Sequence, residues 1–173
     1  VQSYDRVVLL SGLDKDRKRE CLAIVEASVP EFRFNQWLGH EEFVIGVQSK
    51  FVDDENSDKA LLLKFAGTVE SGTLAQYGDD GVSQKATIKT GIASKADAIV
   101  PNPVSLVAWR TFPEVEQPFT RFVFRMKGER DIYCALYEAD GGAWKNQAML
   151  NIARYINDFV REEDIKTHGV VIA

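Results

Sequence analysis

The sequence has very few residues suited to redox, metal or nucleophilic chemistry. Its 173 residues include only two cysteines and two histidines. Cys21 and Cys134 belong to no CxxC pair, which excludes the spacing of a zinc knuckle or a thioredoxin-like dithiol. We expect both to be free thiols that fill a core in a reducing compartment. A Ser-His or Cys-His catalytic pair would need His40 or His168, and neither lies in a nucleophile motif.

Long apolar runs and nucleotide-binding loops are also missing. Apolar runs such as residues 60–63 are far shorter than the ~20 residues of a membrane-spanning helix. No signal-peptide pattern opens the chain, so we expect a cytoplasmic protein without a membrane partner. Because the chain begins with Val1 rather than Met, we expect an upstream segment to be missing. Neither GxxxxGK(S/T) nor GxGxxG occurs, and the sequence predicts no cofactor.

Positive charge is in short supply. The chain has 21 lysines and arginines against 26 acidic residues, which gives a formal net charge of −5. This balance removes the long-range attraction on which most non-specific DNA binders rely, so nucleic-acid binding would need a local basic patch. Hydrophobic residues make up 45% and charged residues 27%, the composition of a packed globular protein. The length is typical of one domain, which we expect to span residues 1–173.

Hydrophobic periodicity predicts helices at two places. Residues 4–10 are expected to form a strand, after which Asp14 offers an N-cap to a helix over residues 15–27. Near the other end, Trp144, Ala148 and Ile152 recur at helical spacing. The second predicted helix therefore covers residues 144–160.

Strand patterns fill most of the remaining sequence. Further strands are predicted over residues 43–48, 60–69, 84–92, 104–112, 119–127 and 132–138, with a polar loop at 71–81. Short loops between neighbouring strands favour antiparallel pairing. We therefore expect an α+β fold, in which an antiparallel sheet of about six or seven strands carries the long C-terminal helix and the early helix.

The predicted strand over residues 119–127 carries the candidate binding residues. Its core face is formed by Thr120, Phe122, Phe124 and Met126, and its other face by Phe119, Arg121, Val123, Arg125 and Lys127. Cations that alternate with aromatic rings are typical of stacking platforms for single-stranded nucleic acid. The candidate partner-binding residues are Arg110, Phe119, Arg121, Arg125 and Lys127, near Tyr133 or Tyr137. An ordinary solvated sheet explains the same pattern if Glu114, Glu116 and Glu138 pair with the cations.

Residues 77–80 read Tyr-Gly-Asp-Asp, the metal-binding turn of RNA-dependent RNA polymerases. Asp79 and Asp80 are therefore the candidate metal ligands of a metal-dependent enzyme. Those polymerases are several times longer than this chain, and no second acidic motif is evident. A solvated turn, in which glycines adopt positive φ and the aspartates cap backbone amides, explains the four residues more simply. We expect no catalytic residue and no metal site here.

Five distinctive segments occur in order along the chain. They are residues 77–84 (YGDDGVSQ), 100–104 (VPNPV), 109–118 (WRTFPEVEQP), 122–127 (FVFRMK) and 135–145 (ALYEADGGAWK). Together they resemble an uncharacterised family of bacteriophage and prophage proteins, the YfdQ-like phage proteins. The resemblance covers most of the chain, weakens toward Val1, and implies a further N-terminal region upstream. No activity or catalytic residue is established for the family, and its members are often encoded near phage early genes, including recombination and single-strand-binding functions.

Three functions stay open on these observations. The first is a non-enzymatic phage accessory protein in the bacterial host cell, which binds single-stranded nucleic acid or a phage or host protein through its sheet. Such a protein would act in phage DNA metabolism or recombination. The second is a virion or assembly component, and the third is a metal-dependent enzyme that uses Asp79 and Asp80. Homo-oligomerisation is compatible with all three.

Overall fold

The computed structural model describes residues 1–70, 73–79, 84–90, 94–100, 102–128, 131–163 and 169–172, and between 68 and 100 it describes the backbone alone. The chain divides into two compact units, each described here by itself. Unit 1 comprises Val1–Pro30, Trp109–Pro118 and Gly142–Ala173. Unit 2 comprises Glu31–Ala108 and Phe119–Gly141. Each unit is therefore assembled from segments that are distant in the sequence.

The N-terminal part of unit 1 is an antiparallel hairpin of β1 (Arg6–Leu10) and β2 (Cys21–Glu26). The strand expected at the N-terminus is confirmed, whereas the helix expected over residues 15–27 is wrong. Asp14 does accept backbone N–H groups, but they belong to Asp16 (2.8 Å) and Lys18 (2.7 Å) in the hairpin loop. An aspartate that caps a helix and one that closes a loop make the same local hydrogen bonds, so the signal was ambiguous.

The C-terminal part of unit 1 is the helix α3 (Ala143–Glu162), which confirms the expected long helix. It begins after Gly142, whose φ of 83° is accessible to glycine without strain. Trp144, Ala148 and Ile152 are buried along one face. The buried part of the helix contacts the loop over residues 109–118, where Asn151 Nδ2 donates to Glu116 O at 2.8 Å.

A single side chain organises that loop. Gln117 Oε1 accepts the N–H groups of Arg110 (2.8 Å) and Thr111 (3.1 Å). Gln117 Nε2 donates to the carbonyls of Phe112 (2.9 Å) and Val115 (3.0 Å). The buried amide therefore supplies the backbone hydrogen bonds that a helix or strand would otherwise supply.

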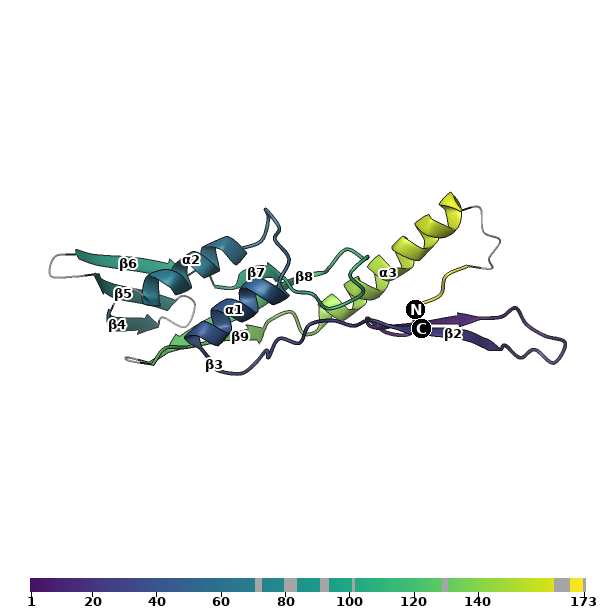
Figure 1. The fold of residues 1–173 in the computed structure, drawn as a ribbon, viewed down its shortest axis with the longest axis horizontal. Coiled ribbons are helices and arrows are strands. Elements are labelled where there is room, and N and C mark those ends of the chain that lie inside the picture. Colours follow the sequence, from purple (N-terminus) through teal and green to yellow (C-terminus); the bar gives the residue numbers. More distant parts are fainter. Residues whose placement is uncertain are drawn as a thin grey trace. The chain divides into compact units, whose positions relative to one another are not determined.

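Unit 2 contains a four-stranded antiparallel sheet in the order β3-β9-β8-β7. The strands are β3 (Leu38–Gly39), β7 (Val104–Val107), β8 (Phe119–Lys127) and β9 (Tyr133–Glu138). The helices α1 (His40–Lys50) and α2 (Lys59–Glu70) pack on one face of this sheet (Figure 1). The core between them is aromatic and fully enclosed, and it includes Phe43, Val47, Leu62, Phe65, Phe122, Phe124 and Leu136.

Both α1 and α2 lie where strands were expected. The alternation of Phe43, Ile45 and Val47 is typical of a strand, but the buried residues of α1 are Phe43, Gly46 and Val47, at helical spacing. In α2 the apolar run hides the same spacing, because Leu62, Phe65 and Ala66 are buried while Leu61 is exposed. Short apolar runs fit either period, and here contact with the sheet decides the outcome.

A buried lysine joins the two helices of unit 2. Lys59, the first residue of α2, donates from Nζ to the carbonyls of Phe51 (2.7 Å) and Gln48 (3.3 Å) at the end of α1. The same nitrogen pairs with Asp53 Oδ1 at 2.7 Å. A cation at the C-terminal end of a helix stabilises carbonyls that lack intrahelical partners.

Unit 2 also contains a three-stranded antiparallel sheet, β4 (Thr73–Asp79), β5 (Gln84–Thr90) and β6 (Ser94–Val100), in that order. The α+β class and the antiparallel pairing are confirmed, but the expectation of a single sheet with six or seven strands is wrong. The described strands form separate sheets of two, four and three. None of the described helices is long and apolar enough to cross a membrane.

Candidate nucleic-acid interface

Strand β8 has one face in the core and one face of exposed or half-buried side chains, as the sequence predicted. Phe122 and Phe124 are completely buried, and Thr120 and Met126 nearly so, under α1 and α2. The side chains between them point to the opposite face, where Phe119, Arg121 and Lys127 are exposed and Val123 and Arg125 are half-buried. Because successive side chains of a strand alternate, packing the phenylalanines inward places all three cations outward.

Neighbouring segments add aromatic rings to this outer face. Tyr133 of β9 lies directly opposite Lys127, and Tyr137 lies opposite Val123. Trp37, just before β3, meets the ring of Tyr137 edge-on at 6.2 Å between centroids. We call the exposed or half-exposed side chains Trp37, Phe119, Arg121, Arg125, Lys127 and Tyr133 the aromatic-basic face.

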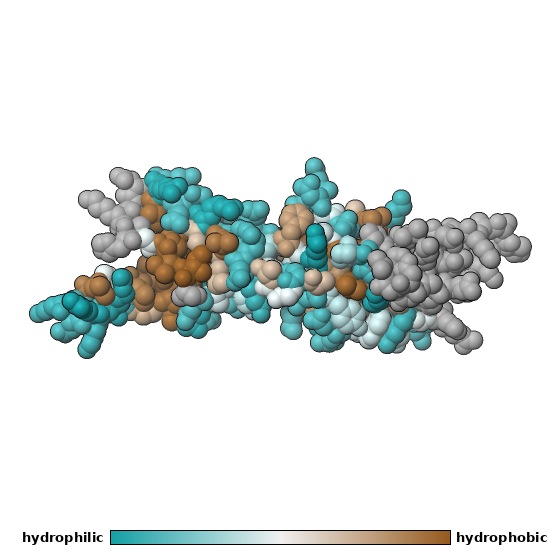
Figure 2. All heavy atoms as spheres, turned by 180° about the vertical axis from the view of Figure 1, so that it is seen from behind, coloured by the Kyte–Doolittle hydropathy of each residue, from teal (hydrophilic) through white to brown (hydrophobic). Residues whose placement is uncertain are grey.

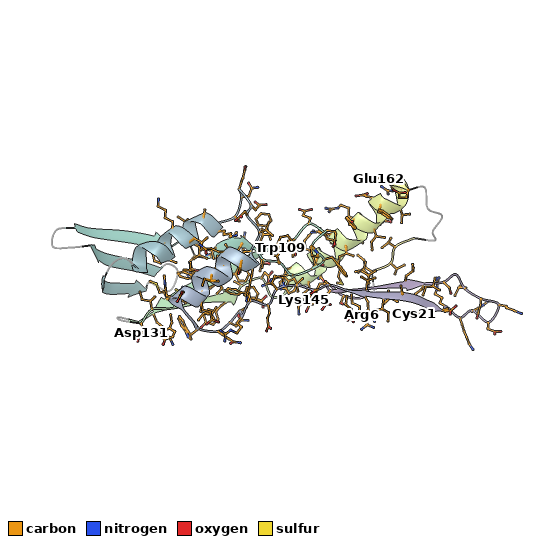
Figure 3. The ribbon with its side chains drawn as sticks, viewed as in Figure 1. Arg6, Cys21, Trp109, Asp131, Lys145 and Glu162 are labelled. Atoms are coloured by element: carbon orange, nitrogen blue, oxygen red, sulfur yellow. The ribbon has the colours of Figure 1, made fainter. Side chains whose placement is uncertain are left out.

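Lys127 connects the cations to the rings. Its Nζ lies 4.3 Å from the centroid of the Trp37 ring and 5.9 Å from that of Tyr133. These distances fall within the range of cation–π attraction. Asp131, which Figure 3 labels, comes two residues before Tyr133, the first residue of β9. The arrangement holds two rings and an ammonium group together at one end of the sheet.

Trp37 is the member of the face that sequence reasoning did not identify. Phe32 and Leu38 are buried, but Trp37 is 38% exposed. The segment is held along β9 by Asn35, whose N–H donates to Leu136 O (2.8 Å) and whose Oδ1 accepts from Glu138 N (3.0 Å). The alternation of side chains along an extended chain could have identified Trp37, because the residue next to a buried Leu38 points to the opposite face.

The cations of the face are not neutralised within the described part of the chain. Arg125 Nη1 donates to Phe124 O at 3.2 Å, but no ion pair joins Arg121, Arg125 or Lys127 to a carboxylate there. Glu116, considered above as a cross-strand partner, instead lies 3.4 Å from Arg154 in unit 1. Glu114 also belongs to unit 1. Among the described residues, these three cations are therefore available to an anionic ligand.

The structure places Arg110 in a different unit from the exposed cations. This residue belongs to unit 1, is only 5% exposed, and lies over the Trp144 ring at 4.2 Å. Tyr4 packs edge-on against the same ring at 4.8 Å. Arg110 thus has a packing role in unit 1, while Phe119, Arg121, Arg125 and Lys127 share one face in unit 2.

The expected metal ligands are not described at the level of side chains. Asp79 is the last residue of β4, where its backbone pairs with Gln84, and its side chain and all of Asp80 lie outside the described residues. Among the residues whose side chains are described, no group of three His, Cys, Asp or Glu could hold a metal ion.

The two cysteines are free and differ in environment. Cys134 of β9 points into the core, where burial raises the pKa of its thiol to about 12. Its expected role as a core filler is confirmed, because such a thiol stays protonated. Cys21 is exposed at the start of β2, so the same expectation is wrong for it. All six residues of that strand are exposed.

The aromatic-basic face can bind an extended polyanion, but it contains no catalytic pair. From Phe119 to Lys127 strand β8 extends about 26 Å, long enough to align rings and cations with several nucleotides. Stacking on such rings tolerates any base, and the cations can contact phosphates. Comparisons of the chain with protein-family models, curated proteins and solved structures give no match.

Proposed function

We propose that the chain is a non-enzymatic module that binds single-stranded nucleic acid through the aromatic-basic face. The observation that carries this proposal is the exposure of Trp37, Phe119 and Tyr133 beside three cations that form no ion pair in the described part of the chain. Solvated sheet surfaces normally balance cations with cross-strand carboxylates. Rings and unbalanced cations together favour bases and phosphates as the ligand.

Charge sets the expected strength of binding. The net charge of −5 opposes the approach of a polyanion, so the affinity is weak to moderate and decreases steeply with salt. Three cations that each neutralise one phosphate of a single strand give a slope of log K against log salt of about −2. The aromatic rings add a contribution that salt does not screen.

The test is fluorescence anisotropy of a labelled single strand at about 50 mM salt, where phosphate contacts are strong. The double variant Arg121→Gln and Arg125→Gln should bind more weakly and show a shallower salt slope. The matched control is Lys15→Gln with Lys18→Gln, which removes the same charge from the exposed hairpin loop of unit 1. Equal losses in both variants, or no binding by the unaltered protein, would contradict the proposal.

A phage-encoded accessory role in DNA metabolism or recombination belongs to the same proposal. Its support is the resemblance of five ordered segments to bacteriophage and prophage proteins. Mass spectrometry of purified virions separates this role from that of a virion component. Abundance in infected cells and absence from particles is the expected result, whereas stoichiometric presence in particles would favour the structural alternative.

A further inference from the structure

The β1–β2 hairpin of unit 1 is apolar on both faces and exposed on both. Its register places Val8 opposite Ile24 and Leu9 opposite Ala23, so the two pairs point to opposite faces. Leu9 is 58% exposed, and Leu10, Leu22, Ile24 and Val25 are each about half exposed. Figure 2 shows apolar surface, in brown, over this hairpin and α3, next to the hydrophilic hairpin loop. Continuous apolar strands are typical of sheets covered on both sides.

In the described part of the chain, one edge of this hairpin has no strand partner. Asp5 O accepts from Ala27 N and Ser11 N donates to Glu20 O, both at 2.8 Å, so odd-numbered residues of β1 face β2. The N–H and C=O groups of Val8 and Leu10 therefore point away from β2. Arg6 is already bonded on that side by Gln2 and Ser3. The open edge consists of Val8, Leu9 and Leu10.

The two edges of the hairpin differ in their protection against other strands. Strand β2 carries a β-bulge at Leu22 and is flanked by Glu20 and Glu26, features that discourage edge pairing. Strand β1 has no charged residue and no proline from Val7 to Leu13. An unprotected apolar edge in a natural sequence indicates a pairing partner.

We propose that the partner is a second copy of this chain, paired antiparallel through β1 about a two-fold axis at Leu9. Val8 of each copy then exchanges N–H and C=O bonds with Leu10 of the other, and the bonds of Arg6 are undisturbed. No like charges meet in this register. The equivalent pairing of two β2 strands about Ala23 would set Glu20 against Glu26 of the second copy, which is unfavourable.

The total exposed apolar area of unit 1 is similar in size to the area that a dimer interface buries. Eleven large apolar side chains of the unit are 40% to 72% exposed; they are Leu9, Leu10, Leu13, Leu22, Ile24, Val25, Leu150, Tyr155, Phe159, Val171 and Ile172. At roughly 50 to 100 Å² each, they offer on the order of 500 to 1,000 Å² per copy. A stable interface buries about 800 Å² per partner. The paired β1 strands supply the register, and Leu9 and Leu10 on the paired edge are buried with them.

Crosslinking tests the register directly. In a Cys21→Ser background, Leu9→Cys places two thiols in a non-hydrogen-bonded pair with Cα atoms about 4.5 Å apart, within disulfide range. The full chain should form a covalent dimer on mild oxidation. Leu13→Cys, equally exposed and four residues away, should form far less. Equal crosslinking of both variants would overturn the Leu9-centred pairing.

The oligomeric state of variants tests whether the dimer forms through the β1 edge. Light scattering with size exclusion over a concentration series should show a dimer for the unaltered chain and a monomer for Leu9→Lys, which sets two ammonium groups opposite each other. Ile45→Lys, at a similarly exposed position in unit 2, should remain a dimer. A monomeric unaltered chain, or a Leu9→Lys dimer, overturns the proposal. Neither result depends on nucleic-acid binding.

Discussion

The two units of this protein differ in the interactions that stabilise each of them internally. Unit 2 encloses an aromatic core, in which the rings of Phe122 and Phe124 are fully buried against two helices. Unit 1 encloses few large side chains and depends on the amide of Gln117, the Asn151 bond and the packing of Arg110 on Trp144. A unit with its own core can present a rigid binding face, whereas a unit that exposes its apolar strands is built to be completed by another chain.

The largest effect is expected from the core of unit 2. Phe124→Ala should lower the free energy of unfolding by about 3 to 5 kcal/mol, because a fully enclosed ring leaves a cavity. Phe159→Ala in α3 of unit 1, where the ring is half exposed, should cost far less. Chemical denaturation checks both. Equal midpoints would mean that the contrast between the units is wrong.

The next largest effect is expected from the buried hydrogen bonds of Gln117 in unit 1. Gln117→Ala should destabilise the protein by roughly 2 to 3 kcal/mol, because two buried N–H groups lose their acceptor. Glu114→Ala, an exposed change in the same loop, should stay within about 0.5 kcal/mol. Thermal unfolding of the two variants measures the difference. A tolerant Gln117 would show that apolar packing, not the amide, holds unit 1.

Trp37 of unit 2 and Trp144 of unit 1 are expected to differ in their effects on binding and on stability. Trp37→Ala should weaken single-strand binding about tenfold, since stacking on one base contributes roughly 1 to 3 kcal/mol. Stability should change little, because Trp37 is partly exposed. Trp144→Ala in unit 1 should do the reverse, lowering stability and leaving the affinity of the folded protein unchanged. Anisotropy and denaturation on the same samples give both readouts.

The smallest effect concerns thiol reactivity. At pH 8 a thiol reagent should modify Cys21 of unit 1 rapidly and Cys134 of unit 2 only after unfolding, because burial raises the Cys134 pKa from 9.0 to about 12. The stability that the neutral thiol contributes is complete below pH 9 and is lost as the pH rises toward 12. Mass spectrometry of labelled peptides checks the order. Rapid labelling of native Cys134 would contradict a closed core.

Sequence reasoning worked best where a segment's own periodicity determines its contacts. The alternation of β8 correctly placed four of the five candidate binding residues on one face, and the spacing of Trp144, Ala148 and Ile152 located α3. It failed over residues 15–27, where Asp14 closes a loop instead of capping a helix. It also gave no sign of two units, because the segments of unit 1 are separated in the chain and no flexible linker marks their boundaries.

The sequence by itself determined which faces of β8 and α3 are apolar, because the periods of strand and helix are properties of the backbone. Only the tertiary structure decided that α1 and α2 are helices, since their short apolar runs suit both periods and the sheet beneath them selects one. It also brought Lys127 over the ring of Trp37 and Arg110 over the ring of Trp144, since both contacts join residues distant along the chain. The periodicity of a single segment can be predicted from its sequence, but contacts between residues distant in the sequence depend on how the whole chain packs.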